Sequence, residues 1–235
     1  MSVKLIVALD FEDSRKALNL VDQLDPSLCA LKVGCEMFTL FGRDFVRTLV
    51  NKNFKVFLDL KFHDIPNTVA HSCIAAADLG VWMIDIHASG GMNMMQAAKK
   101  ALDPYGLGRP LLIAVTVLTS MNVEDLQRLG IHESVENRVS LLAKLSYDAG
   151  LDGVVCSPHE VSAIKALCGP HFLAVTPGIR MPFDSSNDQV RITTPEMALK
   201  AGSDYLVVGR PIIEANKPAD VVQTILSTIK STHLS

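Results

Sequence analysis

Short apolar runs alternate along the chain with longer segments in which apolar residues recur at helical spacing. The runs are rich in Val, Ile and Leu, a pattern typical of strands that are buried on both faces. This pattern predicts eight strands, at Leu5–Leu9, Ala30–Val33, Lys55–Leu60, Trp82–Ile86, Leu111–Val117, Gly153–Cys156, Phe172–Val175 and Tyr205–Val208.

Most of the segments between these runs carry apolar stripes that predict helices. Eight strands alternating with helices in 235 residues favour a TIM (β/α)8 barrel over a flavodoxin-like sheet, which would need fewer strands. The helices are expected at Ser14–Leu24, Val69–Leu79, Met92–Leu102, Val135–Ala149, Pro158–Leu167, Pro195–Ala201 and Pro218–Ile229.

The composition agrees with a single large core. Hydrophobic residues make up 49% of the chain, and no linker rich in Pro, Gly or Ser divides it, so we expect one domain over residues 1–235. The net charge is −3 and there is no run of Lys or Arg. Nucleic acid and anionic membranes are therefore not expected as partners, and small molecules are.

The cysteines indicate a reducing compartment. They form no CxxC pair and mostly lie among apolar residues, as reduced core thiols do, which predicts a cytoplasmic protein. The start of the chain leads directly into a strand, and no apolar stretch approaches the roughly 20 residues of a membrane span, so neither secretion nor insertion is expected. The five cysteines are Cys29, Cys35, Cys73, Cys156 and Cys168.

A barrel of this type carries its chemistry at the C-terminal ends of the strands. Polar residues and glycines gather at those positions here, and lysines and aspartates are among them. A histidine at a strand end is usually a structural hydrogen-bonding residue, so His63 and His87 are given no catalytic role. The strand-end residues are Asp10, Lys32, Gly34, Asp59, Lys61, His87, Thr119, Ser120, Pro177, Gly178, Gly209 and Arg210.

Asp59 and Lys61 stand out because they follow an apolar run and are two residues apart, so they should share one face. An isolated Asp-x-Lys is more often a structural ion pair than a functional site. Burying unpaired charge costs several kcal/mol, roughly, so the convergence of Lys32 and Asp10 on the same barrel mouth favours a polar site.

Two loops indicate a phosphorylated ligand. The loops after strands seven and eight of such barrels commonly bind phosphate through backbone N–H groups, close-approaching glycines and a helix N-terminus. Thr176–Arg180 and Val208–Pro211 occupy these places, and each supplies an arginine, whose planar fork suits a phosphate dianion.

Six motifs at the strand ends together carry a family resemblance: Val7–Asp10, Leu31–Gly34, Asp59–Thr68, Val115–Met121, Thr176–Arg180 and Val207–Pro211. Through them, and over essentially its whole length, the chain resembles the orotidine 5′-phosphate decarboxylases of bacterial type. The D-x-K-x-x-D core of the third-strand motif is shared with a wider suprafamily, whereas the full ten-residue block from Asp59 to Thr68 is specific.

The resemblance implies decarboxylation of orotidine 5′-phosphate to UMP in pyrimidine biosynthesis, without a cofactor or metal. Lys61 would stabilise the carbanion at C6 of the pyrimidine and donate its proton, and Asp59 would face the departing carboxylate. An alternation of Lys32, Asp59, Lys61 and Asp64 would hold each charge against an opposite one and keep Lys61 protonated.

The resemblance also implies the substrate contacts and a homodimer whose sites borrow Asp64 and Thr68 from the partner subunit. A polar segment from Met181 to Val190 would be a lid, or else an ordinary surface loop. The expected contacts are Asp10 and Lys32 with the ribose, Thr119 and Ser120 with the pyrimidine, and Arg180, Gln189, Gly209 and Arg210 with the phosphate.

Two other functions compete with this interpretation. A sister decarboxylase of the suprafamily acts on a keto-sugar phosphate with Mg²⁺. It needs an acidic residue at the position where this chain has Lys32, and a lysine there would repel the metal. A barrel that only binds a nucleotide would need the phosphate loops but not the costly array of Lys and Asp.

Overall fold

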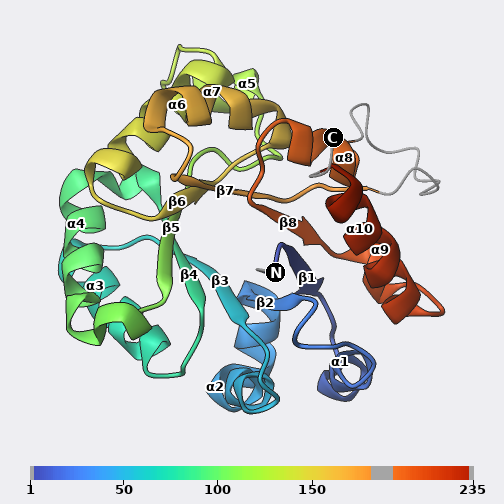
Figure 1. Ribbon diagram of the computed structural model, residues 1–235. Helices are drawn as coiled ribbons and strands as arrows, with labels where there is room; N and C mark the ends of the chain where they lie inside the picture. The colour runs from blue at the N-terminus through green and yellow to red at the C-terminus, as the bar shows by residue number, and fades with distance from the viewer. Residues whose placement is uncertain (1–2, 181–192, 233–235) are drawn as a thin grey trace.

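The computed structural model describes residues 3–180 and 193–232. Its strands form a closed barrel in which β1 to β8 follow one another in chain order and all pairs are parallel (Figure 1). The TIM barrel is thereby confirmed, and each predicted strand lies within two residues of its observed ends. The strands are β1 (Leu5–Leu9), β2 (Ala30–Gly34), β3 (Val56–Phe62), β4 (Met83–His87), β5 (Leu111–Val115), β6 (Gly153–Val155), β7 (Leu173–Thr176) and β8 (Tyr205–Val208).

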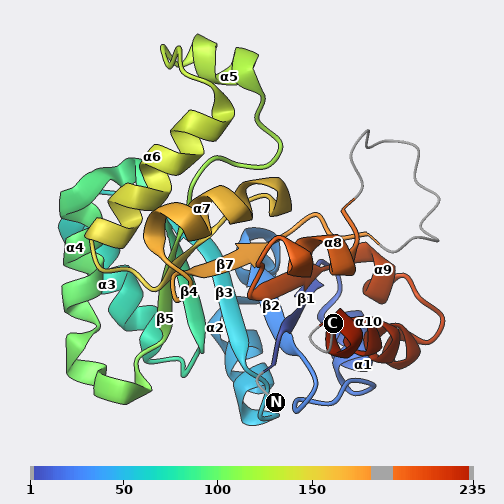
Figure 2. The same cartoon turned by 45° about the horizontal axis from the view of Figure 1, so that its top comes forward.

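Helices surround the barrel, and the α5 region stands out beyond the others (Figure 2). The predicted helices are present, with ends shifted by up to three residues, and Pro158–Glu160 forms a 3₁₀ turn before α7. The α-helices are α1 (Ser14–Val21), α2 (Cys35–Asn51), α3 (Pro66–Ala77), α4 (Gly91–Ala101), α5 (Val123–Arg128), α6 (Val135–Asp148), α7 (Val161–Cys168), α8 (Pro195–Lys200), α9 (Arg210–Ile213) and α10 (Pro218–Thr232).

Helix α2 was not predicted, although it has 17 residues. Gly42 lies inside it with φ 63° and ψ −158°, so the helix is interrupted and each half is too short to show a clear period. Its buried residues Met37, Phe45, Val46 and Leu49 nevertheless form one apolar face against the barrel.

Alternation along each strand separates two cores. One set of side chains fills the barrel, and the other packs between the strands and the helices. Because side chains alternate along a strand, the residue two positions after each interior residue points to the same side, and it lies at the C-terminal mouth of the barrel. The barrel interior contains Ile6, Ala8, Ala30, Phe57, Met83, Ile113, Val175 and Val207.

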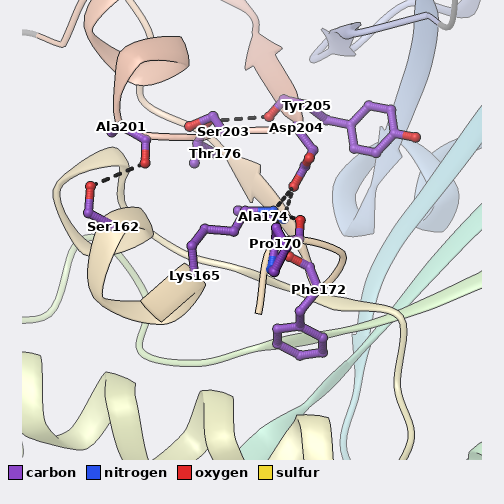
Figure 3. Close-up of polar contacts among 10 residues, drawn as sticks. All are labelled: Ser162, Lys165, Pro170, Phe172, Ala174, Thr176, Ala201, Ser203, Asp204 and Tyr205. Atoms are coloured by element: carbon purple, nitrogen blue, oxygen red, sulfur yellow. Dashed lines mark hydrogen bonds and ion pairs between the residues drawn. The ribbon is translucent and has the colours of Figure 1, made fainter. Parts of the chain in front are cut away.

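Two ion pairs connect neighbouring strands at the N-terminal end of the barrel, and Figure 3 shows the one formed by Asp204 and Lys165. Asp204, just before β8, accepts the backbone N–H of Ala174 at 2.7 Å and pairs with Lys165 of α7 at 2.6 Å. Asp152, just before β6, likewise accepts a backbone N–H of β5 at 2.7 Å and binds Arg109 through two bonds of 2.6 Å. These groups hold the scaffold at the end remote from the polar strand ends.

Barrel closure joins the first and last strands. Val7 pairs with Val208, and the N–H of Leu206 donates to the carbonyl of Lys4 at 2.9 Å. None of the helices in the described ranges is long and apolar enough to cross a membrane. All five cysteines are free thiols; Cys29, Cys73, Cys156 and Cys168 are buried as expected, whereas Cys35 at the start of α2 is exposed.

Candidate active site

A cavity of about 220 Å³ opens at the C-terminal ends of the strands. Lys32, Asp59 and Lys61 form its charged wall, while apolar side chains from β5 to β8 form the opposite wall. Such a site can hold an aromatic ring against the apolar side and present charge to one of its edges. The remaining lining residues are Phe57, Val115, Val117, Leu118, Thr119, Val155, Val175, Pro177 and Val207.

The carboxylate of Asp59 bridges two ammonium groups. One oxygen lies 2.9 Å from Nζ of Lys32, and the other lies 2.5 Å from Nζ of Lys61. The side chains of Lys32 and Asp59 are 13% and 11% exposed, while that of Lys61 is 32% exposed and thus open to a ligand. The sequence prediction that these three charges converge is confirmed.

Lys32, Asp59 and Lys61 form a charged cluster, and each charge influences the protonation of its neighbours. Burial by itself raises the pKa of Asp59, but Lys32 and Lys61 outweigh it and hold that pKa well below its ordinary value. Burial lowers the pKa of Lys61, and the adjacent Asp59 more than offsets this, so the net pKa is raised. At neutral pH the pocket therefore presents an ammonium beside an ionised carboxylate.

Lys61 reaches this position through an irregular backbone. Its φ is 51°, in the left-handed region, and β3 changes register against β4 between Leu58 and Phe62. A regular strand would place Asp59 and Lys61 on one face by simple alternation. Here a bulge aims Lys61, as bulges next to functional sites often do.

Asp85 of β4 was missed by the sequence analysis. It is completely buried, and its side chain lies within hydrogen-bond reach of Asp59. Burial and the negative charge of Asp59 raise the pKa of Asp85 well above its ordinary value. The signal was available, because an aspartate between Ile84 and Ile86 breaks an apolar run as conspicuously as Asp59 does.

Asp64 and Thr68 lie outside the cluster. Both are exposed, and the carboxylate of Asp64 accepts the backbone N–H of Ile65 at 2.7 Å. Within the described part of the chain Asp64 forms no ion pair. The expected series of alternating charges, Lys32, Asp59, Lys61 and Asp64, therefore ends at Lys61 within one subunit. A role for Asp64 and Thr68 in a neighbouring subunit stays a prediction.

Three of the residues expected at the ribose and phosphate, Asp10, Gly209 and Arg210, follow β1 and β8, which pair with each other. A Cβ built on Gly209 would lie 3.5 Å from Cβ of Ala8 and 3.6 Å from a carboxylate oxygen of Asp10, which are ordinary van der Waals distances, so the end of β8 lies against the end of β1. Arg210 is exposed and begins α9. An exposed arginine thus follows directly on the glycine that lies against Asp10.

The other predicted contacts are distributed around the same mouth. Thr119 lines the cavity, and Ser120 is exposed next to it. The backbone N–H of Arg180 donates to the carbonyl of Thr193 at 3.1 Å, and its guanidinium donates to the carbonyl of Ile179 at 3.3 Å. Gln189 and the whole predicted lid, Met181–Val190, lie outside the described residues.

His63 and His87 lie beside this cluster, with ring centroids 5.5 Å apart. Burial, the neighbouring His63 and Lys61 lower the pKa of His87, which therefore favours its neutral form. Neither histidine lines the cavity. In residues 3–180 and 193–232, no three His, Cys, Asp or Glu side chains are grouped so that they could hold a metal ion.

The model of the orotidine 5′-phosphate decarboxylase / HUMPS family matches residues 3–225. The chain belongs to this family. The match spans every strand of the barrel and includes the residues of the charged wall. The family resemblance that the sequence motifs indicated is thereby confirmed.

Curated relatives and solved structures agree. A protein of Legionella pneumophila (strain Paris) is 58% identical over 96% of this chain and 99% of its own length, and one of Haemophilus influenzae (strain ATCC 51907) is 60% identical over 96% and 98%. A crystal structure from Lactobacillus acidophilus is 38% identical, covers 97% of this chain and 99% of its own, and has a TM-score of 0.86. All three are named orotidine 5′-phosphate decarboxylase.

Proposed function

We propose that this chain decarboxylates orotidine 5′-phosphate to UMP and CO₂ in pyrimidine biosynthesis, without a cofactor. The observation that carries the proposal is the Asp59 carboxylate held between the ammonium groups of Lys32 and Lys61 at the wall of a ring-sized cavity. The names of relatives about 58% identical over nearly the whole chain support the substrate.

In the proposed reaction, the bond between C6 and the carboxylate carbon breaks and its electron pair stays on C6. Nζ of Lys61 stabilises this carbanion and then gives it a proton, while CO₂ leaves and solvent reprotonates the lysine. Asp59 repels the substrate carboxylate as long as both are charged, and this repulsion is relieved when CO₂ departs. The raised pKa of Lys61 supports its role as the proton donor.

The other side chains of the mouth would bind the rest of the substrate. We assign Asp10 and Lys32 to the ribose and Thr119 and Ser120 to the pyrimidine edge. The phosphate is assigned to Gly209, Arg210, Arg180 and Gln189. The close approach of Gly209 to Asp10 supports this, because phosphate and ribose are joined through one carbon.

We further propose that the enzyme is a cytoplasmic homodimer in which Asp64 and Thr68 complete the partner's site. The exposure of both residues beyond the end of β3 supports this arrangement. The free thiols agree with a reducing compartment.

Turnover assayed with and without a chelator tests the proposed function. We expect decarboxylation of orotidine 5′-phosphate at the same rate before and after exhaustive chelation, because the charged wall offers a carboxylate already paired with two ammonium groups. Release of UMP and CO₂ is the measurement. Activity that is lost on chelation and restored by Mg²⁺ would favour the metal-dependent sister reaction, and saturable binding without turnover would favour a nucleotide-binding barrel.

Arg210→Ala should weaken the productive binding of substrate. If Arg210 binds the phosphate by charge-assisted hydrogen bonds, kcat/KM for orotidine 5′-phosphate should fall on the order of 10- to 100-fold. The value for orotidine, which lacks the phosphate, should not change. Arg47→Ala, on an exposed arginine of α2, is the matched control. Equal losses with both substrates would remove Arg210 from the phosphate site.

A further inference from the structure

The carboxyl group of Asp85 is buried and forms no ion pair within residues 3–180 and 193–232. Its exposed fraction is 0%, and among the described residues Oδ2 has no hydrogen-bond donor. The ion pairs of the cluster link Asp59 to Lys32 and Lys61 and leave Asp85 out. Burying an ionised carboxylate in this position would cost free energy of folding, so the groups around Asp85 decide whether it carries a proton.

The bulge in β3 supplies a hydrogen-bond donor to one oxygen of Asp85. Leu58 pairs with Ile84 and Phe62 with Ile86, so residues 59–61 stand opposite Asp85 alone. The backbone N–H of Lys61 donates to Oδ1 of Asp85 at 2.8 Å. A residue with left-handed φ costs of order 1–3 kcal/mol, and this bond helps to hold Lys61 there.

The side chain of Asp85 also lies beside a second carboxyl group. The side chains of Asp85 and Asp59 lie within hydrogen-bond reach, and Asp59 already accepts from both ammonium groups and is the ionised member. Two buried carboxylates in contact do not both ionise. Toward α3, Asp85 faces the thiol of Cys73, whose pKa burial and this aspartate raise to about 12; on β5 its partner is the apolar Ile113.

We propose that Asp85 carries a proton in the native enzyme, donates its O–H to the Asp59 carboxylate and accepts the N–H of Lys61. It is a positioning residue: it orients Asp59 toward both lysines and holds the backbone that aims Lys61 at the substrate. The part of this inference that concerns catalysis rests on the proposed function, whereas the protonation of Asp85 does not.

Two substitutions separate these roles. Asp85→Asn keeps an acceptor for Lys61 and a donor for Asp59, so its kcat should stay close to the native value. Asp85→Ala removes both bonds, and kcat should fall on the order of 10- to 100-fold while KM changes little. If the Asn variant loses as much kcat as a folded Ala variant, the positioning role is overturned.

The proton itself is tested without substrate. At neutral pH the infrared spectrum of the native protein should contain the carbonyl band of a neutral carboxylic acid, and Asp85→Asn should remove it. Asp204→Asn, which changes a carboxylate paired with Lys165, should leave the band in place. A native spectrum without the band would refute protonation of Asp85, whatever the enzyme is found to catalyse.

Stability against pH gives an independent reading. In the unfolded chain Asp85 ionises near its ordinary pKa of 3.8, whereas the folded protein keeps the proton to much higher pH. The contribution of Asp85 to the unfolding free energy therefore falls as pH rises above about 4, and Asp85→Asn lacks this contribution. The variant should gain unfolding free energy over the native protein from pH 4 upward. A difference of the opposite sign would mean that Asp85 is ionised, and would overturn the proposal.

Discussion

Replacing Lys61 by alanine should abolish turnover while a UMP analogue still binds. In the proposed reaction the ammonium group acts where charge develops on C6, so its loss should affect the transition state far more than the bound ground state. Loss of both proton donation and electrostatic stabilisation should lower kcat by at least about three orders of magnitude. Single-turnover kinetics and calorimetric titration with the analogue measure the two quantities separately.

The variant should fold, because Asp59 keeps its 2.9 Å ion pair with Lys32. Circular dichroism and the thermal midpoint check this. Lys100→Ala, at an exposed lysine of α4, is the matched control and should keep native kinetics. A fall in kcat of less than tenfold in folded Lys61→Ala would show that the proton donor has been assigned wrongly.

Mixed dimers of Lys61→Ala and Asp64→Asn chains should recover activity that neither variant has alone. If each site takes Lys61 from one chain and Asp64 from the other, one site of the mixed dimer carries both lesions and the other carries none. Random pairing makes half of the dimers mixed, so roughly a quarter of native activity should return by two-fold symmetry.

Differential tags on the two chains allow the mixed dimers to be purified and their composition verified. Homodimers of each variant carried through the same procedure provide the baseline. If Asp64 served its own chain, every site would keep one lesion, and verified mixed dimers would remain inactive. The exposed position of Asp64 and its bond to Ile65 favour the shared arrangement.

The sequence predicts the barrel because strand burial leaves a strong local pattern. Each strand is a short apolar run, and the number of runs, their spacing and the helices between them leave few alternative topologies. The convergence of Lys32, Asp59 and Lys61 follows from the same pattern, since all three end their strands at one mouth. The barrel fold is therefore enough to predict that these three residues lie close together.

Features that depend on tertiary context were not predicted. The left-handed φ of Lys61 and the register shift of β3 have no local sequence signal, because neither glycine nor proline marks the bulge. Asp85 does interrupt an apolar run in the sequence, but its hydrogen bond to the backbone of Lys61 becomes visible only when the pairing of β3 with β4 is known. Helix α2 was missed for a local reason, the break at Gly42.

Because β1 pairs with β8, the barrel and its site can form only after the last strand has been synthesised. Lys32, Asp59 and Lys61 are made early, but Gly209, which lies against Asp10, follows the last strand. Until β8 is available, the edges of β1 and β7 lack their partner, and such edges are prone to pair with other chains. A ribosome-bound chain that ends before β8 thus contains Lys61 but has an open barrel, and its principal hazard is aggregation.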